Sequence, residues 1–288
     1  MHERRSPQRF ARERHVNIHQ SEQTRRTNGA FCYSDALRCA IAALIMGLVA
    51  LTHLACLGQI DTTSVSKMRK TIVDTAQKAH PFIKWVGGKG QLIEQLSELL
   101  PEDLATEKDL VYVEPFVGGG AMLFHMLSTY TNISHAVIND MNCDLIATYK
   151  VVRDNPEALI LRLQEMQDTY RKCTTDEERK KCYLQARESY NGRGHSDVEV
   201  AALFIFLNRT CFNGLYRVNS KGLFNVPFGK ATNPLICDKE TILADSLLLR
   251  KVEICEGDFA AVEGKVGRKA FFYFDPPYRP LTQTASHQ

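Results

Sequence analysis

The segment AFFYF ends in four residues whose chemistry can be stated directly: Asp275, Pro276, Pro277 and Tyr278. The Asp275 carboxylate and the Pro276 carbonyl oxygen can each accept a hydrogen from an aromatic amine, and proline adds no competing N–H. Tyr278 can stack on a flat base. Two such acceptors free a ring-delocalised lone pair for direct attack on a methyl group. The tetrad thus predicts alkylation of an amine such as that of adenine, and a strand with a rigid turn is the plainer alternative.

A glycine-rich turn lies upstream, where a predicted strand at 110–113 runs into EPFVGGGA and a predicted helix at 121–127. Glycines permit a tight turn and close approach of the backbone to a ligand, and the helix start presents free N–H groups. Asp140 follows the next predicted strand, where a ribose-binding acid stands in doubly wound nucleotide folds. No Lys-Ser/Thr pair follows the glycines, so an adenosyl ligand fits this turn better than a triphosphate.

Two further positions have open interpretations. Trp85, the only tryptophan, stands in KWVGGKGQL and is either a core residue or an aromatic lid over a ligand. Asp258 follows a predicted strand at 253–255 and could simply cap the next turn, but its place one strand before the tetrad favours a hydrogen bond from an adenine amino group.

The elements around these residues alternate between strands and helices. Strands are predicted at 110–113, 136–138, 253–255 and 270–274, and helices at 91–100, 121–127, 145–153, 156–173 and 175–190. The apolar stretch 201–207 fits a buried helix or a strand equally well. This alternation predicts an α/β fold with a largely parallel sheet and a site at the carboxyl ends of its strands.

The net charge of the whole chain says little about a binding partner, whereas the charge of one stretch is informative. The net charge is +3, and residues 1–67 contribute nine basic and five acidic residues to it. The stretch 208–230 contains Arg209, Arg217, Lys221 and Lys230 and no acid, so it could bind a polyanion or form a solvated basic loop. The nine cysteines form no CxxC pair, which favours free thiols in a reducing cytoplasm and predicts no metal site.

Residues 1–67 do not match the rest of the chain. Positions 1–35 are polar and predicted to be disordered, and the apolar run 39–51 is short for a membrane span. A signal-like segment and a membrane anchor are the alternatives. We expect an N-terminal extension without a role in the fold, with Met68 as a plausible alternative start and no stable membrane partner.

Five ordered motifs, KWVGGK, EPFVGGG, INDMN, NRTCFNGLYRVNSKGLFNVPFGK and FDPPY, resemble the Dam-type DNA adenine-N6 methyltransferases (D12 class, alpha group) across residues 78–282. The resemblance implies a Rossmann-like, S-adenosylmethionine-dependent methyltransferase fold. It divides the chain into methyltransferase parts at 68–154 and 248–288 and a helical and hairpin target-recognition insert at 155–247. It implies a cofactor site from Trp85, Gly87, Lys89, Glu114, Phe116, Gly118, Gly120, Asp140 and Asp258, with Asp275 to Tyr278 at the target base.

The resemblance also implies double-stranded DNA as the partner and GATC as the recognition site. Arg217 would read guanine in the major groove, because arginine pairs bidentately with guanine O6 and N7. Phe212 would wedge into the base stack, with the other DNA contacts at Lys84, Asn213, Leu215 and Pro227. A cognate restriction endonuclease that acts on the same site is a further expected partner.

The family continues beyond its tetrad, whereas ten residues follow Tyr278 here. We therefore expect a C-terminally truncated sheet and a chain that is poorly stable or inactive, since a sheet without its far strands exposes a hydrophobic edge. Two other functions remain open: an RNA or protein methyltransferase with the same tetrad, and a non-catalytic DNA-binding remnant.

Overall fold

A computed structural model describes residues 67, 70–71, 73–266 and 269–277 of this chain. Residues 1–66 of the predicted N-terminal extension, which include its apolar run, lie outside the described residues, and so does the fourth residue of the tetrad, Tyr278. Within the described ranges, no helix is both long and apolar enough to cross a bilayer.

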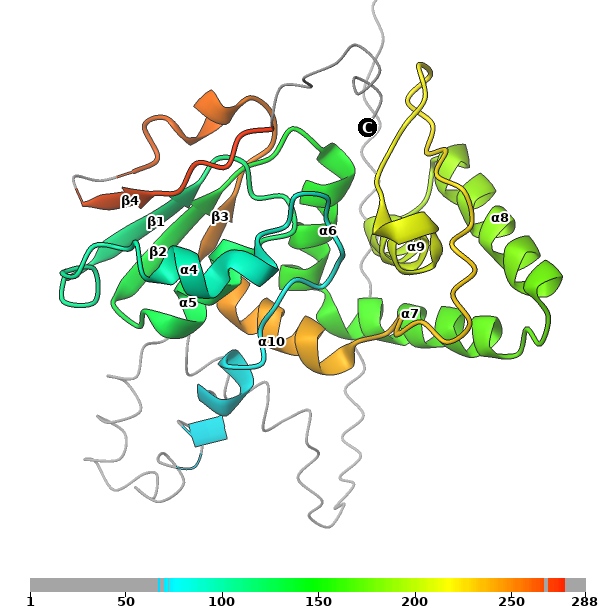
Figure 1. Cartoon of the computed structure of the whole chain (residues 1–288), viewed down its shortest axis with the longest axis horizontal. Coiled ribbons are helices and arrows are strands. Elements are labelled where there is room, and N and C mark those ends of the chain that lie inside the picture. Colours follow the sequence, from blue (N-terminus) through cyan, green and yellow to red (C-terminus); the bar gives the residue numbers. More distant parts are fainter. Residues whose placement is uncertain (1–66, 68–69, 72, 267–268, 278–288) are drawn as a thin grey trace, which may run out of the picture. The chain divides into compact units, whose positions relative to one another are not determined.

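Four parallel strands form one sheet in the order β3-β2-β1-β4. They are β1 (Leu110–Glu114), β2 (Ile133–Ile138), β3 (Val252–Ile254) and β4 (Ala270–Phe272). The register pairs Val113 of β1 with Val137 of β2 and with Phe272 of β4, so the carboxyl ends of all three strands meet at one edge (Figure 1). The predicted mixed α/β fold with a parallel sheet is confirmed.

The two faces of the sheet are buried against different partners. Leu110 and Tyr112 of β1 belong to the large core, whereas Val113 joins a small cluster with Val137 and Val262 on the other face. Alternation along a strand explains this division, because successive side chains point to opposite faces. The large core is therefore built between one face of the sheet and the helices.

The helices are η1 (Gly90–Leu92), α4 (Ile93–Ser97), α5 (Ala121–Thr129), α6 (Cys143–Asp154), α7 (Pro156–Arg171), α8 (Asp176–Gly192), α9 (Asp197–Thr210), η2 (Phe212–Gly214), α10 (Lys239–Leu249) and η3 (Phe259–Val262). Every helix predicted from the sequence is present, and the ambiguous stretch 201–207 is helical within α9. The helix α10 was not predicted. Eight of its eleven residues are buried, so it shows no amphipathic stripe.

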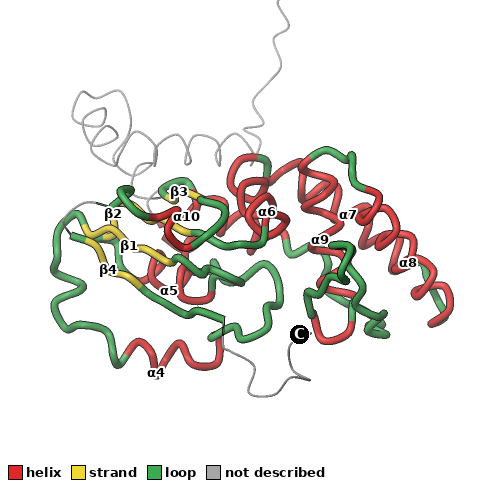
Figure 2. Tube along the Cα trace, turned by 90° about the horizontal axis from the view of Figure 1, so that it is seen from above, coloured by secondary structure: helices red, strands yellow, loops and turns green. Residues whose placement is uncertain are grey.

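Helix α6 lies between the sheet and the helices α7, α8 and α9 (Figures 1 and 2). Helix α9 contacts α6, α7 and α8, and seven consecutive residues, Ala201 to Leu207, are buried. After α9 the chain folds back as a hairpin, with antiparallel bridges between Cys211 and Phe228 and between Val218 and Phe224. We call residues 211–228 the hairpin.

Candidate active site

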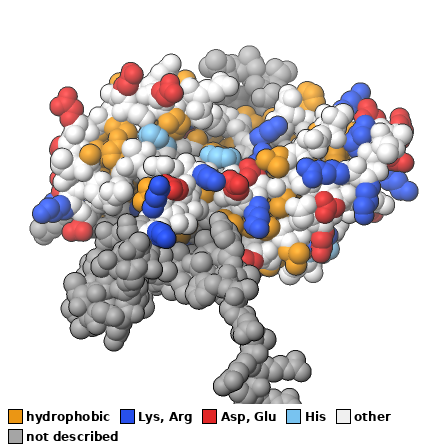
Figure 3. Space-filling view, turned by 90° about the horizontal axis from the view of Figure 1, so that it is seen from below, with side chains coloured by type: hydrophobic (Ala, Val, Ile, Leu, Met, Phe, Trp, Pro, Cys, Tyr) orange, Lys and Arg blue, Asp and Glu red, His pale blue; other side chains and the backbone are white. Residues whose placement is uncertain are grey.

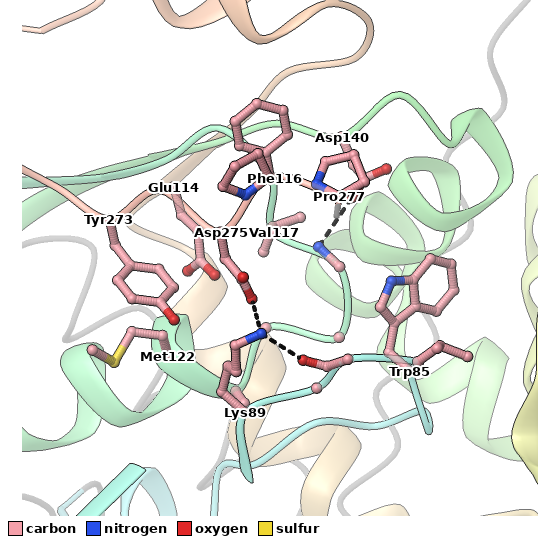
Figure 4. A pocket seen from close by; sticks show the side chains of 18 of the residues that line it. Trp85, Lys89, Glu114, Phe116, Val117, Met122, Asp140, Tyr273, Asp275 and Pro277 are labelled. Atoms are coloured by element: carbon pink, nitrogen blue, oxygen red, sulfur yellow. Dashed lines mark hydrogen bonds and ion pairs between the residues drawn. The ribbon is translucent and has the colours of Figure 1, made fainter. Parts of the chain in front are cut away.

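A cavity of about 580 Å³ lies beside the carboxyl ends of β1 and β4 (Figure 4). Its volume is within the range of about 300–1,000 Å³ that is usual for small-molecule sites. Its lining includes eleven residues predicted for the site: Trp85, Gly87, Lys89, Glu114, Phe116, Gly118, Gly120, Asp140, Asp275, Pro276 and Pro277. Segments that are far apart in the sequence thus share one hollow.

The turn after β1 accepts only glycine at two positions. Gly118 and Gly120 have φ angles of +49° and +76°, a region that side chains other than glycine rarely adopt. A Cβ atom at Gly118 would lie 2.8 Å from Cδ1 of Trp85, and one at Gly120 would lie 2.4 Å from the Tyr149 hydroxyl oxygen. That hydroxyl donates to the Gly118 carbonyl oxygen at 3.1 Å. The turn is therefore packed tightly against the side chains of Trp85 and Tyr149.

Asp140 fixes this turn from the neighbouring strand end. Its Oδ2 accepts a hydrogen bond from the Gly118 backbone N–H at 3.0 Å, and its Oδ1 accepts one from Asn142 N–H at 2.9 Å. An ionised carboxylate has about four acceptor positions. Asp140 therefore retains acceptor capacity for ligand hydroxyl groups while it holds the turn.

Asp275 is engaged by a lysine from the other glycine cluster. Lys89 Nζ lies 2.8 Å from Asp275 Oδ2 and also donates to the Gly87 carbonyl oxygen at 3.1 Å (Figure 4). The two side chains are only 16% and 22% exposed. Water screens such a partly buried pair less than a surface pair, so Lys89 holds the Asp275 carboxylate in a defined place at the cavity.

Glu114 is the buried acid of the site. Burial raises the pKa of Glu114 to about 8, with further upward contributions from Asp275 and Asp140. A hydrogen bond donated by the Tyr112 hydroxyl at 2.8 Å lowers the Glu114 pKa in part. Near neutral pH the Glu114 side chain is therefore mostly uncharged.

Val117 and Gly119 of the predicted EPFVGGG loop also line the cavity, whereas sequence reasoning missed six other lining residues: Val86, Gly88, Ala121, Met122, Met141 and Tyr273. One of them had a detectable signal. Tyr273 stands two residues before Asp275 in the strand predicted at 270–274. In the structure β4 ends at Phe272, and Tyr273 and Asp275 follow it and both line the cavity.

Asn139 was also missed, and it ties the strand ends together. Its side-chain amide donates to the carbonyl oxygens of Pro115, Gly257 and Asp258 at 3.2, 2.9 and 3.3 Å. A buried asparagine just after a strand has no distinctive sequence pattern, because its partners come from loops elsewhere in the chain.

Asp258 is not among the residues that line the cavity. Its Oδ1 accepts a hydrogen bond from the Ala260 backbone N–H at 3.0 Å and so caps η3. This geometry corresponds to the first of the two interpretations of Asp258, the cap of the next turn.

The residues predicted to contact DNA are brought together around the hairpin. Phe212 N–H donates to the Pro227 carbonyl oxygen at 2.9 Å, and the Phe212 side chain is 49% exposed. A Cβ atom at Gly214 would lie 2.7 Å from the Lys84 Cβ, so Lys84 is packed directly against the hairpin. Asn213 and Leu215 flank that glycine, and Arg217 Nε donates to Asn225 Oδ1 at 2.8 Å.

Comparisons with a protein family and with individual proteins all identify similarity to DNA methyltransferases. The model of the D12 class N6 adenine-specific DNA methyltransferases matches residues 85–288. The type II methyltransferase M.MjaIII of Methanocaldococcus jannaschii is 46% identical over 209 residues, which cover 72% of this chain and 71% of that relative. M1.LlaDCHI, a type II methyltransferase of Lactococcus lactis subsp. cremoris, is 42% identical over 72% of this chain and 68% of its own length.

The DNA adenine methylase of Escherichia coli K12 is 31% identical, over 73% of this chain and 69% of its own length. All three matches cover more than two thirds of both proteins. The matched family range contains every residue found to line the cavity. The chain therefore belongs to the D12 class of N6 adenine-specific DNA methyltransferases.

Proposed function

We propose that this enzyme transfers the methyl group of S-adenosylmethionine to the N6 amino group of adenine in double-stranded DNA, within the sequence GATC. The observation that supports this most directly is the shared cavity: the glycine turn, Asp140 and the first three residues of the tetrad line one space of about 580 Å³. A methyl donor and an acceptor amine must meet in such a space for direct transfer.

The lining of the cavity fits a sulfonium nucleoside. S-adenosylmethionine supplies a methyl group on a positively charged sulfur. Asp140 accepts hydrogen bonds from the ribose hydroxyl groups, and the glycine turn lets the backbone approach the ligand closely. Trp85 and Phe116 cover the adenine ring of the cofactor, and Lys89 attracts the carboxylate group of the cofactor. The neutral state of Glu114 provides a hydrogen-bonding group without adding another negative charge.

The target adenine enters from the side of Asp275. The base must leave the duplex, because its amino group cannot reach the cavity from within the base stack. Asp275 and the carbonyl oxygen of Pro276 each accept one hydrogen of the amino group, Pro277 keeps the turn rigid, and Tyr278 stacks on the ring. Catalysis is then positioning together with fixed electrostatics, and no covalent enzyme intermediate is required.

The region 155–247 recognises DNA through the hairpin, between the methyltransferase parts 68–154 and 248–288. Arg217 reads a guanine edge, Phe212 wedges into the stack, and Asn213, Leu215, Pro227 and Lys84 contact the neighbouring bases. Several similar proteins are named DNA adenine methylase and others type II methyltransferase. A cognate restriction endonuclease at the same site is the corresponding partner, and the cytoplasm is the place of action.

The test is methyl transfer from labelled S-adenosylmethionine to two duplexes that differ only by exchange of GATC for GTAC. We expect label in N6-methyladenine of the GATC duplex alone. Equal labelling of both duplexes would contradict the GATC assignment. Label on RNA or on protein, with none on DNA, would contradict the proposed substrate.

A further inference from the structure

Tyr216 connects the hairpin to the wall of the cavity. Its ring stacks on the indole of Trp85, with ring centroids 5.8 Å apart and an interplanar angle of 25°. Trp85 lines the cavity and also touches the glycine turn, since a Cβ atom at Gly119 would lie 2.9 Å from the Trp85 Cβ. Trp85 is thus held between the turn on one side and the hairpin on the other (Figure 4 shows Trp85 at the cavity wall).

A buried acid holds the hydroxyl end of Tyr216. Asp144, the second residue of α6, is 6% exposed. Its carboxylate accepts hydrogen bonds from the hydroxyl groups of Tyr216, at 3.4 Å, and Tyr190, and from Arg193 Nη1 at 2.8 Å. These three donors come from the hairpin, from α8 and from the loop before α9. Asp144 therefore joins α6, which begins at Cys143, three residues after Asp140, to the hairpin and to the end of α8.

The segment before Trp85 is tied to the hairpin as well. The buried side chain of Asn208 accepts a hydrogen bond from Lys84 N–H at 2.8 Å. It also donates to the carbonyl oxygens of Lys84 and Gly214, at 2.8 and 3.0 Å. Trp85 is thus connected to the hairpin in two ways: through Lys84 and Asn208 to Gly214, and through the ring of Tyr216.

We propose that Tyr216 and Asp144 are positioning residues that couple the cofactor cavity to the DNA-reading hairpin, so that each ligand strengthens the binding of the other. The inference rests on the proposed function. A nucleoside cofactor that packs against Trp85 restricts the indole ring. Tyr216 then stacks on an ordered partner, and the adjacent Arg217 loses less conformational freedom when it engages a base. Coupling of this kind is reciprocal.

Neither residue is expected to touch a ligand. Asp144 is buried, and Tyr216 does not line the cavity. Their effect is therefore transmitted through Trp85 on one side and Arg217 on the other. This separates the proposal from a direct role in cofactor or base recognition.

The experiment measures thermodynamic coupling in the full chain. Calorimetry gives the Kd of sinefungin, a non-reactive cofactor analogue, with and without a saturating GATC duplex. We expect the duplex to tighten sinefungin binding by about fivefold or more in the wild type. Tyr216→Phe keeps the ring on Trp85 but removes the hydroxyl bond to Asp144, and we expect the coupling to fall below twofold.

Tyr170→Phe is the matched control, because it also removes a buried hydroxyl bond, donated to the Ala231 carbonyl oxygen, outside this network. We expect this control to keep the wild-type coupling, and Asp144→Asn to behave like Tyr216→Phe, with thermal unfolding recorded for every variant. Unchanged coupling in Tyr216→Phe would overturn the proposal, and so would an equal loss in Tyr170→Phe. A wild type that binds neither sinefungin nor DNA would instead contradict the proposed function on which the inference rests.

Discussion

Three acids and one lysine lie around the cavity. Asp275 is held by Lys89, Asp140 is held by the backbone of the turn, and Glu114 is mostly neutral because it is buried. Full negative charges on Asp275, Asp140 and Glu114 would repel one another, because all three residues line the same cavity. The neutral Glu114 and the cationic Lys89 limit the negative charge of the site, and the charge that remains is consistent with the sulfonium cofactor that we propose.

Substitution Asp275→Asn tests the role of the tetrad. The amide keeps the shape of the side chain but replaces one acceptor oxygen with a donor, so an amine hydrogen is no longer well held. We expect single-turnover methyl transfer to fall by about 100-fold or more, as for loss of one preorganised polar group in an active site. Asp168→Asn, on exposed α7 surface, is the control and should retain the wild-type rate. A rate for Asp275→Asn within threefold of wild type would argue against a catalytic role.

The raised pKa of Glu114 predicts how stability depends on pH. Between about pH 4.5 and 8 the folded state keeps a proton on Glu114 that the unfolded state has released. The folded state then binds more protons, so the free energy of unfolding contributed by this group falls as the pH rises through this window. Glu114→Gln should remove that decline, measured as the change in Tm between pH 5 and pH 8. The exposed control Glu157→Gln should decline as the wild type does, and an equal decline in Glu114→Gln would contradict the assigned pKa.

At the scale of elements, the site is built by strand ends and helix starts. The turn between β1 and α5 and the segment between β2 and α6 meet through Asp140, and the hairpin is attached through Lys84 and Trp85. Parallel strands place such connections at one edge of a sheet. This explains why motifs separated by more than a hundred residues converge on one cavity.

Gly120→Ala tests the packing of the glycine turn. The new methyl group would be forced into the Tyr149 hydroxyl at a φ of +76°. We expect a loss of about 1–3 kcal/mol in the free energy of unfolding, measured by denaturant titration. Gly192→Ala, at the end of α8 with no atom within 4 Å of the added Cβ, is the matched control and should change stability by less than about 1 kcal/mol. Equal stability of the two variants would contradict the tight turn.

Two substitutions in the hairpin can distinguish recognition of a base from contact with the phosphate backbone of DNA. Arg217→Ala should weaken binding to a GATC duplex by about 1–3 kcal/mol and leave binding to a GTAC duplex almost unchanged. Lys221→Ala, four residues along, should weaken both complexes similarly and reduce the slope of log K against log salt by about one. Equal losses on both duplexes for Arg217→Ala would mean that Arg217 contacts only the backbone.

At the scale of the molecule, we expect the overall charge to contribute little to DNA binding, because the net charge is only +3. Figure 3 shows one face on which Lys and Arg side chains are interspersed with Asp and Glu. The stretch 208–230, which contains the hairpin, has in contrast no acidic residue. Attraction to DNA is thus expected to come from a limited surface rather than from the overall charge.

Much of the fold could be predicted from the sequence, because strands and amphipathic helices have characteristic periods. Helix α10 could not, since it is buried on most sides and lacks such a period. The motif residues of the cavity were predictable from glycines, acids and the tetrad, whereas the contacts of Asn139 and Asp144 were not. Their partners lie in distant segments, and only the folded chain brings them together.

The central claim is that one cavity holds the methyl donor beside Asp275, and the single tryptophan reports on it directly. Trp85 fluorescence should change saturably when sinefungin is added to the wild type. The Kd should rise at least tenfold in Asp140→Asn and stay within threefold of wild type in Asp275→Asn, because we propose that Asp140 binds the nucleoside and that Asp275 binds the target amine. No change in Trp85 fluorescence at saturating ligand, or the same Kd in Asp140→Asn as in the wild type, would contradict this account.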